Sequence, residues 1–447
     1  MKLYRTPESD EEKEEQFLAG NIPVAVYGLG KMGLPVAARF ADVCGNVLGV
    51  DIDPEVVETV KSGRAPFDHE PDLDKLIEAS VESDRLRPTT DSKKAASEAA
   101  VHIIIVPTLV TQENQPDLSV LRSVLRDVTT GIEEGDMVIV ESTVPPRTCE
   151  DVVQPFVKKH SNLRSGEFGV AFCPERTHSG RALRDIRRWP KVVGGVDDES
   201  TRVAELMYEN ITENEVVSVA DSTTAEAVKV FTGVYRDVNI ALVNEFATLA
   251  DEAGFDVQEA MDVASDMPFV HPFRPGAGVG GHCIPLYPYF LINQFAGETD
   301  LIEAARERND SMPSFIVQKL LEGLDDIEVA TSEATIAVLG LTYRPGVPET
   351  SHSPSKSVVK RLTELVDTVY VIDPLLDDFT AFQDTVPISI DKFHNVDLDG
   401  VALVTAHDIF KTIEWSEFEK LAIVDGRNAI GKAETDHWLY TVGKGKR

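Results

Sequence analysis

Three glycines near the amino terminus have the spacing of a dinucleotide-binding turn. Gly28, Gly30 and Gly33 form the pattern GxGxxG, directly after an apolar stretch and directly before a helical one. Such a turn lets backbone amides approach a pyrophosphate, and the following helix N-terminus adds partial positive charge. Asp51 ends the next apolar stretch, near the offset at which a carboxylate binds the ribose hydroxyls and disfavours the phosphate of NADP. The pattern therefore predicts NAD binding, against the alternative of a packing turn in an α/β protein that binds no nucleotide.

Cys283 is the strongest candidate for a reactive side chain. It follows a run of glycines in the segment PGAGVGGHCIPLYPYF, whose open backbone would let a ligand lie against the thiol. The other cysteines, Cys44, Cys149 and Cys173, are widely spaced without CxxC pairs. We expect these three to be inert core residues rather than disulfide partners or zinc ligands. Covalent catalysis at Cys283, with no metal, is the chemistry that this distribution favours.

The composition limits the kinds of partner. Acidic residues number 76 against 43 basic ones, which gives a formal net charge of −33. A surface this acidic repels nucleic acid and anionic lipid, so we expect neither as a partner. Strong acidity is also one way in which halophilic proteins stay soluble, and we favour a high-salt enzyme over an ordinary acidic cytosolic one.

The amino terminus carries charge where a signal peptide would carry an apolar core. Residues 1–20 contain a dense run of acidic and basic side chains, and no stretch of the chain is long and apolar enough to span a bilayer. We expect a solvated acidic tail over residues 1–20 and a cytoplasmic protein without membrane contact.

The elements that must position these residues alternate between strands and helices. A chain of 447 residues exceeds one core, so we expect two or three domains. From residue 21 to about 205, apolar strands such as PVAVYGLG, NVLGVDID, VHIIIVP and DMVIVEST are separated by helical segments. This βαβ alternation, which continues through GVAFCPER and KVVGGV, predicts a doubly wound parallel sheet.

A helical region and a second sheet follow. Between Thr223 and Gly254 there is no proline, and apolar residues recur at spacings of three and four, which predicts one long helix. Helical patterns fill residues 206–322, and strand patterns resume over 323–447 with ATIAVLGLTYRPG, TVYVIDP, VALVTAHDIF and AIVDGRN. The predicted fold class is α/β, with two Rossmann-like doubly wound parallel sheets joined by a helical middle domain. The two sheets could be distant duplicates.

An ordered set of segments resembles the UDP-glucose/GDP-mannose dehydrogenase family. The segments are GLGKMGLPVA, VPT followed by PDLS, ESTVPPRT, CPERTHSGRAL, AEAVK, GVGGHCIP and GLTYRPGV, and they extend over residues 22–430. The resemblance implies an NAD-binding domain over 21–205, a helical dimerisation domain over 206–322 and a UDP-sugar-binding domain over 323–447. It also implies a homodimer, or a larger homo-oligomer, built on the long middle helix.

The resemblance further implies a reaction. The family oxidises the C6 alcohol of a UDP-sugar to a carboxylate with two NAD molecules and does not release the aldehyde. Cys283 would trap that aldehyde as a thiohemiacetal, which becomes a thioester and is hydrolysed. By position, Glu175 would activate the water, Thr143 would help to hold it and Lys229 would stabilise the oxyanions.

The same motifs imply the ligand contacts. The residues expected to bind the cofactor are Gly28, Gly30, Lys31, Met32, Gly33, Asp51, Val106, Thr108, Ser142 and Thr143. The residues expected to bind the substrate are Arg176, Lys229, Gly233, Arg236, Gly280, Tyr287 and Arg344.

The chain departs from the family pattern close to its expected site. Gly233 stands where the family typically has an asparagine, and Tyr287 stands where it has an aspartate. The segment PETSHSP has Ser351 and His352 where an arginine is expected, and Arg147 replaces a common glycine. A subfamily with a rearranged site, a poor enzyme and an inactive paralogue that binds nucleotide sugars would each explain this. We favour the rearranged site, because the expected nucleophile, base and lysine are all present.

The stretch YRDVNIALVNEF resembles the N-acetylhexosamine branch of the family. We therefore expect UDP-N-acetylmannosamine as the substrate, with UDP-N-acetylglucosamine and UDP-glucose as alternatives. Arg236, seven residues after Lys229, could meet the diphosphate or the N-acetyl group, or could instead form a solvent-exposed salt bridge with Asp237 or another neighbour. The small β-hydroxyacid dehydrogenases share GLGxMG and a lysine-bearing helix, but the chain length and the second sheet argue against that class.

Overall fold

The computed structural model describes residues 1–68, 70–178, 180–431 and 437–444. The chain forms two compact units, Met1–Phe231 and Thr232–Arg447, each with its own sheet and its own core. The predicted fold class is confirmed, since each unit contains a Rossmann-type sheet and long helices lie between the two sheets in the sequence.

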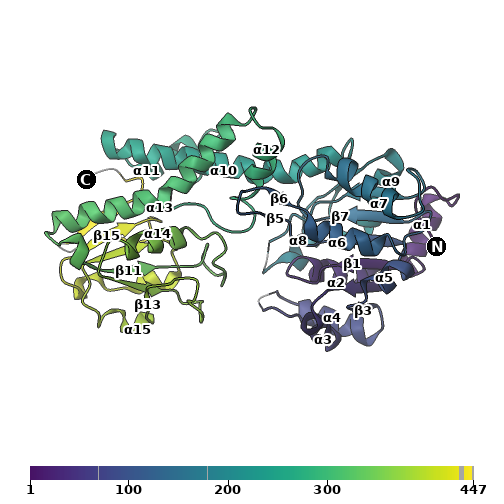
Figure 1. Ribbon diagram of the computed structural model, residues 1–447, viewed down its shortest axis with the longest axis horizontal. Helices are drawn as coiled ribbons and strands as arrows, with labels where there is room; N and C mark the ends of the chain where they lie inside the picture. Colours follow the sequence, from purple (N-terminus) through teal and green to yellow (C-terminus); the bar gives the residue numbers. More distant parts are fainter. Residues whose placement is uncertain (69, 179, 432–436, 445–447) are drawn as a thin grey trace. The chain divides into compact units, whose positions relative to one another are not determined.

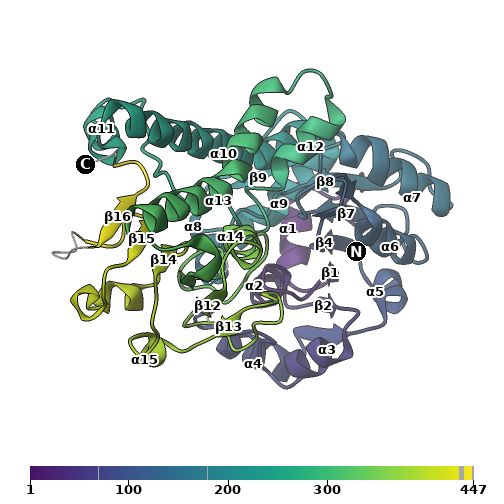
Figure 2. The same cartoon turned by 60° about the vertical axis from the view of Figure 1, so that its left-hand side comes forward.

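The sheet of the first unit has eight strands in the order β10-β9-β8-β7-β4-β1-β2-β3. Figure 2 shows β8, β7, β4, β1 and β2 succeeding one another in this order. The strands are β1 (Val24–Tyr27), β2 (Val47–Val50), β3 (Leu86–Thr89), β4 (Val101–Ile104), β7 (Met137–Val140), β8 (Gly169–Phe172), β9 (Lys191–Gly195) and β10 (Val216–Ser218). A separate ribbon of two short strands joins β5 (Leu109–Val110) and β6 (Pro116–Asp117).

Helices cover both faces of the first sheet (Figure 1). Val24 and Val26 of β1 enter one apolar cluster and Ala25 and Tyr27 enter the other, as alternation along a doubly covered strand requires. The helices are α1 (Asp10–Leu18), α2 (Gly33–Cys44), α3 (Pro54–Lys61), α4 (Leu73–Glu82), α5 (Ser92–Glu98), α6 (Ser119–Val128), α7 (Gln154–His160), α8 (Ala182–Arg188) and α9 (Asp198–Ile211). A π-helical turn over Cys149–Val153 precedes α7.

One strand pair departs from the expected parallel sheet. β9 runs antiparallel to β8, and β10 follows the direction of β9. The chain therefore leaves β8 and enters β9 at the same edge of the sheet, so the segment between these strands stays at the carboxyl edge. The sheet also continues past residue 205, which lies inside α9, so this unit extends beyond the expected boundary.

The expectation of a solvated tail was wrong. Leu3, Tyr4 and Phe17 are completely or almost completely buried, and α1 packs against α2 and α9. The hydroxyl of Tyr4 donates to Asp197, and a capping box between Ser9 and Glu12 begins α1. The charge run conceals these few apolar residues, whose burial fixes the segment to the sheet unit.

The sheet of the second unit has six parallel strands in the order β13-β12-β11-β14-β15-β16. The strands are β11 (Thr335–Leu339), β12 (Thr368–Ile372), β13 (Val386–Pro387), β14 (Gly400–Leu403), β15 (Ala422–Asp425) and β16 (Trp438–Thr441). Ile336 and Val338 face one apolar cluster and Ala337 and Leu339 face the other. When strands are numbered by their order in the chain, the six strands of this sheet lie in the order 3-2-1-4-5-6. The six mutually parallel strands of the first sheet, β1 to β4, β7 and β8, lie in the same order, as in dinucleotide-binding folds.

The long helix expected over residues 223–254 is confirmed as α10 (Ser222–Ala253). It is followed by α11 (Val257–Ala264), α12 (Tyr287–Gln294) and α13 (Asp300–Asp326). Because α13 packs directly on β14, β15 and β16, the middle helices from Thr232 onward share one compact unit with the second sheet (Figure 1). The remaining helices are α14 (Pro354–Thr363), α15 (Ile390–Phe393) and the 3-10 turns Thr331–Glu333, Asp408–Thr412 and Trp415–Glu417.

The same glycine turn follows the first strand of each sheet, β1 and β11. The N–H of Gly28 donates to the carbonyl of Val50, and the N–H of Gly340 donates to the carbonyl of Ile372, both at 2.8 Å. After each of these glycines, a leucine N–H donates to the aspartate that follows the second strand of its sheet, Asp51 at 2.8 Å and Asp373 at 2.7 Å. The shared turn supports the view that the sheets are distant duplicates.

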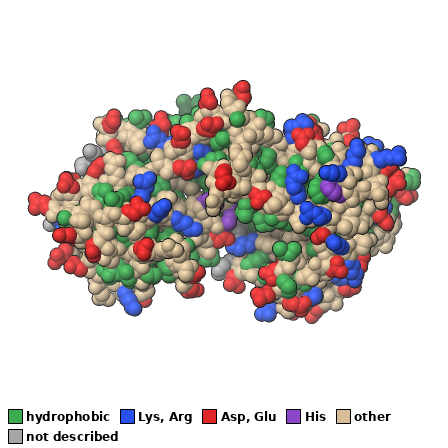
Figure 3. Space-filling view, in the orientation of Figure 1, with side chains coloured by type: hydrophobic (Ala, Val, Ile, Leu, Met, Phe, Trp, Pro, Cys, Tyr) green, Lys and Arg blue, Asp and Glu red, His purple; other side chains and the backbone are tan. Residues whose placement is uncertain are grey.

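Acidic side chains are scattered over the visible face of the molecule, with lysine and arginine side chains between them (Figure 3). Within the described ranges, no helix is long and apolar enough to cross a membrane.

Candidate active site

The glycine turn after β1 has the geometry that a pyrophosphate needs. Gly28 has a φ of 98°, and a Cβ on Gly33 would lie 1.9 Å from the carbonyl oxygen of Gly28, so both positions require glycine. A Cβ on Gly30 would meet no atom within 4 Å. The turn is therefore packed at its two ends and open in its middle, which fits the approach of a dinucleotide to the backbone at Gly30.

Asp51 follows β2 at the same edge of the sheet. Its carboxylate accepts hydrogen bonds from the N–H groups of Leu29 at 2.8 Å and Asp53 at 3.0 Å. The carboxylate is thus held beside the glycine turn, and with two donors it keeps acceptor positions for ribose hydroxyls. Ile52 is 90% exposed beside it, and this apolar side chain, which the sequence analysis passed over, is suited to cover an adenine ring.

The next two strands bring further expected cofactor residues to this edge. The hydroxyl of Ser142, after β7, accepts from the N–H of Val106 and donates to its carbonyl, both at 2.8 Å, and so joins the ends of β4 and β7. Oγ1 of Thr108 is buried without a hydrogen-bond partner in the part of the chain that the structure describes. Met32 precedes α2, and its sulfur accepts a contact from Thr177 Oγ1 at 3.6 Å. Ligands of open α/β sheets bind outside the carboxyl ends of strands such as these.

Glu175 and Lys229 come together in the first unit. Glu175 follows β8 and is almost completely buried, with its carboxylate accepting from the N–H of Thr177. The ammonium of Lys229, on α10, donates to the main-chain carbonyl of Glu175. Arg176 follows in the same loop and is half-buried. The structure thus joins the expected general base and the expected oxyanion-binding lysine through one main-chain contact.

The ESTVPPRT loop contains Thr143 and a residue with an unusual backbone. Arg147 has a φ of 72°, in the left-handed region that favours glycine, which explains why glycine is common there. Its guanidinium pairs with Asp151 at 2.8 Å. The loop is tied to α10 because the N–H of Cys149 donates to the buried carboxylate of Glu226 at 2.8 Å, and burial raises the pKa of Glu226 to about 7.

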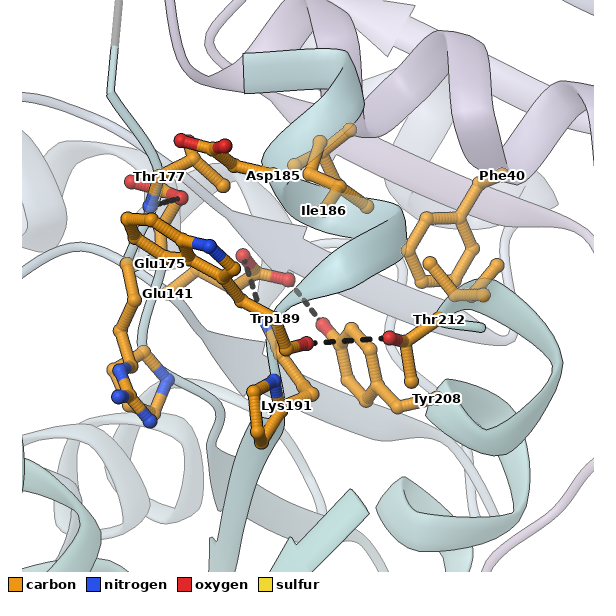
Figure 4. Close-up of a pocket in the computed structure, with 15 residues that line it drawn as sticks. Phe40, Glu141, Glu175, Thr177, Asp185, Ile186, Trp189, Lys191, Tyr208 and Thr212 are labelled. Carbon is orange, nitrogen blue, oxygen red and sulfur yellow. Dashed lines mark hydrogen bonds and ion pairs between the residues drawn. The ribbon is translucent and has the colours of Figure 1, made fainter. Parts of the chain in front are cut away.

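Beside Glu175 lies a pocket with a buried charged cluster (Figure 4). The carboxylate of Glu141 is fully buried, pairs with Lys191 at 2.9 Å and accepts a hydrogen bond from Tyr208. Burial raises the pKa of Glu141, and Lys191 opposes that effect. Glu141 comes from the end of β7, Lys191 begins β9 and Tyr208 belongs to α9. The sequence alone does not identify these three residues as neighbours, because their contact depends on the antiparallel turn into β9.

The four cysteines divide as expected. Cys44, Cys149 and Cys173 are buried, whereas Cys283 is exposed. Its neighbours hold it on both sides: the N–H of Gly281 donates to the carbonyl of Ser351 at 2.9 Å, and the carbonyl of Cys283 accepts from the N–H groups of Leu286 and Tyr287. The thiol therefore reaches solvent from a fixed backbone.

The glycines before Cys283 serve packing as well as access. Gly281 has a φ of 96°, and a Cβ on it would lie 2.9 Å from the ring of Tyr343; a Cβ on Gly280 would lie 2.8 Å from the carbonyl of His352. We expected the glycine run to be open for a ligand, but these positions are filled by neighbouring residues. Arg344, the next residue after Tyr343, donates to the Tyr343 hydroxyl at 3.1 Å.

The two unexpected residues, Gly233 and Tyr287, touch each other. A Cβ on Gly233 would lie 2.4 Å from Cδ2 of Tyr287, so the tyrosine ring occupies the space of any side chain at position 233. Three residues later, Arg236 is exposed and has no ion pair with a described residue. The suggested pairing with Asp237 is contradicted: Asp237 is buried and pairs with Arg306 of α13.

A chain of buried polar groups runs from this ion pair to the glycine run. Asn309 donates to Oδ1 of Asp237 at 2.8 Å and accepts from Asn244 at 2.8 Å, and Asn244 accepts from the N–H of Gly276 at 2.8 Å. From the sheet of the same unit, the Arg427 guanidinium, which follows β15, donates to the carbonyl of Gly278 at 3.2 Å. Both sides of the second unit thus hold the segment that leads to Cys283.

The expected site residues fall into two groups. The first unit contains the cofactor residues together with Thr143, Glu175, Arg176 and Lys229, and the second unit contains Gly233, Arg236, Gly280, Cys283, Tyr287 and Arg344. Lys31 belongs to the first unit as well, in the glycine turn that precedes α2.

Sequence models of one family match the chain in order. The "UDP-glucose/GDP-mannose dehydrogenase family, NAD binding domain" matches residues 22–212. The central domain of that family matches residues 223–311, and its UDP binding domain matches residues 337–432.

Known proteins are similar over nearly the full length. A UDP-N-acetyl-D-mannosamine dehydrogenase of Pyrococcus horikoshii is 35% identical over 427 residues, which cover 94% of this chain and 99% of the relative. A solved structure of UDP-D-ManNAc dehydrogenase from the same organism has a TM-score of 0.86 at 34% identity and covers 95% of this chain and 99% of that one. A UDP-glucose dehydrogenase structure from Pyrobaculum islandicum has a TM-score of 0.84 at 26% identity, with coverage of 94% and 98%.

Proposed function

The chain belongs to the UDP-glucose/GDP-mannose dehydrogenase family, and from this premise we propose that it oxidises the C6 alcohol of UDP-N-acetylmannosamine to a carboxylate. Members of this family are NAD-dependent oxidoreductases, and the open middle of the glycine turn fits that cofactor. The observation that carries the proposal is the single exposed cysteine on an anchored backbone, since the other three are buried.

The proposed chemistry runs through the thiol of Cys283. Bound NAD supplies a hydride acceptor for each of the two oxidations. After the first, the Cys283 sulfur bonds to the aldehyde carbon and the carbonyl oxygen takes a proton, which gives a thiohemiacetal. Loss of a second hydride and of the hydroxyl proton leaves a thioester. Water then adds to the thioester carbon while Glu175 takes one of its protons. The carbon–sulfur bond breaks, that proton returns from Glu175 to the Cys283 sulfur, and the acid that is formed ionises to the carboxylate.

The first unit supplies the groups that act on charge and water in this proposal. Glu175, whose side chain is almost completely buried, accepts a proton of the attacking water. Thr143 holds the water by its hydroxyl. Lys229 stabilises the oxyanions, and its ammonium is already aimed at the Glu175 loop by the carbonyl contact.

The substrate assignment rests on the relatives and on the middle helix. The Pyrococcus horikoshii protein, named for UDP-N-acetyl-D-mannosamine, is more similar in sequence than the UDP-glucose dehydrogenase structure, at 35% against 26% identity. We assign Arg236 to the diphosphate or the N-acetyl group, because it is exposed and without an ion pair among the described residues.

The decisive experiment measures how many NADH molecules are formed for each UDP-sugar molecule oxidised. We expect two NADH per molecule of UDP-N-acetylmannosamine, with slower or no turnover of UDP-N-acetylglucosamine and UDP-glucose. Cys283→Ala should complete no turnover, whereas Cys44→Ala should keep the stoichiometry. One NADH per substrate with Cys283 dispensable would favour the β-hydroxyacid class, and UDP-sugar binding without any NADH would favour a binding paralogue.

We also propose that a homodimer forms through α10. Tyr235, Leu242 and Leu249, spaced by seven, are 54%, 48% and 50% exposed and follow one face of the helix. Apolar side chains in such a row are suited to bury against the same row of a second copy. Leu242→Asp should therefore lower the mass measured by analytical ultracentrifugation, and Glu252→Ala should not.

A further inference from the structure

The contact between Gly233 and Tyr287 links helix α10 to the segment that carries Cys283. Tyr287 is 7% exposed, and its ring lies so close to α10 that a Cβ on Gly233 would come within 2.4 Å of Cδ2 and 3.3 Å of Cγ. Such distances leave no room for any side chain at position 233. The ring is therefore set directly on the helix backbone.

The backbone of Tyr287 is in turn tied to Cys283. Tyr287 is the first residue of α12, and its N–H donates to the carbonyl of Cys283 at 3.0 Å; the N–H of Leu286 donates to the same oxygen at 3.1 Å. A shift of the ring moves the start of α12, and these two bonds pass the shift to Cys283. On its other side, Cys283 is held through Gly281 and Ser351. The ring contact thus determines one of the two anchors of the thiol.

Gly233 is costly to the helix that contains it. Glycine inside a helix is less stable than alanine, because it loses more backbone freedom on folding. The position has a normal helical backbone, since it is not among the residues of positive φ. Only the close approach of Tyr287 gives glycine an advantage here.

We propose that Gly233 and Tyr287 act as a pair of positioning residues for Cys283, with the Tyr287 ring packed on the bare backbone of α10. In this assignment the ring positions the thiol, and the hydroxyl takes no part in proton transfer. The proposal rests on the proposed function only in taking Cys283 as the nucleophile. It explains why the two unusual residues occur together: each one is accommodated by the other.

The first test is a double-mutant cycle with alanine. Gly233→Ala in the native chain should lower the unfolding midpoint, because the new Cβ collides with the ring. In the Tyr287→Ala background the same Gly233→Ala change should raise the midpoint, because only helix propensity remains. Asn239→Ala on the same helix should behave alike in both backgrounds. Equal effects of Gly233→Ala in both backgrounds would overturn the proposal.

The second test measures the thiol itself. The rate of Cys283 alkylation by iodoacetamide is followed by mass spectrometry on the full chain without NAD or sugar. It should change by about 3-fold or more in Gly233→Ala, in which the ring is displaced, and also in Gly233→Ala/Tyr287→Ala, in which the ring is absent, whereas Asn239→Ala should keep the native rate. An unchanged rate in folded Gly233→Ala would contradict a positioning role. If Gly233→Ala does not fold, the proposal is tested by Gly233→Ala/Tyr287→Ala, which has no ring for the new Cβ to collide with and should fold. Failure of this double variant to fold would contradict the proposal.

The third test separates ring from hydroxyl. Tyr287→Phe keeps the ring, so kcat should fall by less than about 3-fold, whereas loss of a group that transfers a proton costs about 10²-fold or more. A loss of that larger size in Tyr287→Phe would overturn the assignment. Because alkylation needs no turnover, a native protein without dehydrogenase activity would refute the proposed function and leave this inference to be judged by the first two tests.

Discussion

The main-chain N–H of Gly276 donates a hydrogen bond to Oδ1 of Asn244, 2.8 Å away, and so ties the segment leading to Cys283 to helix α10. Asn244 is completely buried and donates its own N–H to Asn309, which is bonded to Asp237. A buried group in such a chain costs more when its partner is removed than it contributes while paired.

Asn244→Leu should therefore be strongly destabilising. The change leaves the N–H of Gly276 and Oδ1 of Asn309 buried without partners, and each lost partner costs about 1–3 kcal/mol. The expected decrease in the free energy of unfolding is about 2–6 kcal/mol, measured by urea denaturation. Asn239→Ala, which removes an amide bonded within the same helix turn, is the control. Similar decreases in the free energy of unfolding for the two variants would show that the buried hydrogen-bond chain contributes no more than one hydrogen bond within a helix.

Gly30 and Gly33 should respond to alanine in opposite ways. Gly30→Ala meets no neighbouring atom, so the thermal midpoint should stay within about 2 °C while the KM for NAD rises about 10-fold or more. Gly33→Ala places a Cβ on the carbonyl of Gly28 and should lower the midpoint whether or not NAD is bound. Calorimetry with and without NAD separates the two effects. Normal NAD affinity in Gly30→Ala would argue against a pyrophosphate at this turn.

Glu226 should make stability depend on pH. Burial raises its pKa from 4.5 to about 7, so between these values the folded protein binds more protons than the unfolded chain. The free energy of unfolding then falls as the pH rises through that window, by about 3 kcal/mol in all. Glu226→Gln should flatten this part of the profile, measured by guanidinium unfolding at about pH 5 and about pH 8. Glu150→Gln, at a half-buried carboxylate in the π-helical turn that contacts Glu226 through Cys149, serves as the control. An equally steep profile in Glu226→Gln would assign the dependence to other groups.

Salt should support activity if the acidic surface is an adaptation to it. The net charge of −33 repels itself at low ionic strength, and screening over about 3 Å at ~1 M salt removes most of that repulsion. We therefore propose that turnover and the thermal midpoint rise between ~0.1 M and ~2 M KCl. Activity that is highest without added salt and lost at ~2 M would exclude the halophilic reading.

Local patterns predict most of the fold. The apolar strand patterns found in the sequence became β1, β2, β4, β7, β8, β9, β11, β12, β14 and β15, because a strand covered on both faces is almost entirely apolar. The helix over residues 223–254 was equally visible, since its spacing persists for many turns.

Features that depend on partners distant in sequence were not predictable. The residues of β9 do not show that this strand runs antiparallel to β8. The ion pair between Lys191 and Glu141, which depends on that direction, was therefore not predictable either. The burial of Tyr4 is hidden by the charges around it. The fit of Tyr287 against Gly233 joins positions 54 residues apart by sequence number, and each alone looks like a defect of the site.

The same turn occurs in both sheets, but its aspartate keeps free hydrogen-bond acceptor positions only in the first sheet. Asp51 accepts two N–H groups and retains free acceptor positions. Asp373 accepts from the N–H groups of Leu341, Thr342 and Leu375, and the His407 ring lies 3.1 Å from the same carboxylate. Burial opposes ionisation of Asp373, but these bonds together lower its pKa. The carboxylate in the second sheet is thus saturated by the protein itself, and a sugar nucleotide could not displace its partners without unfolding the turn.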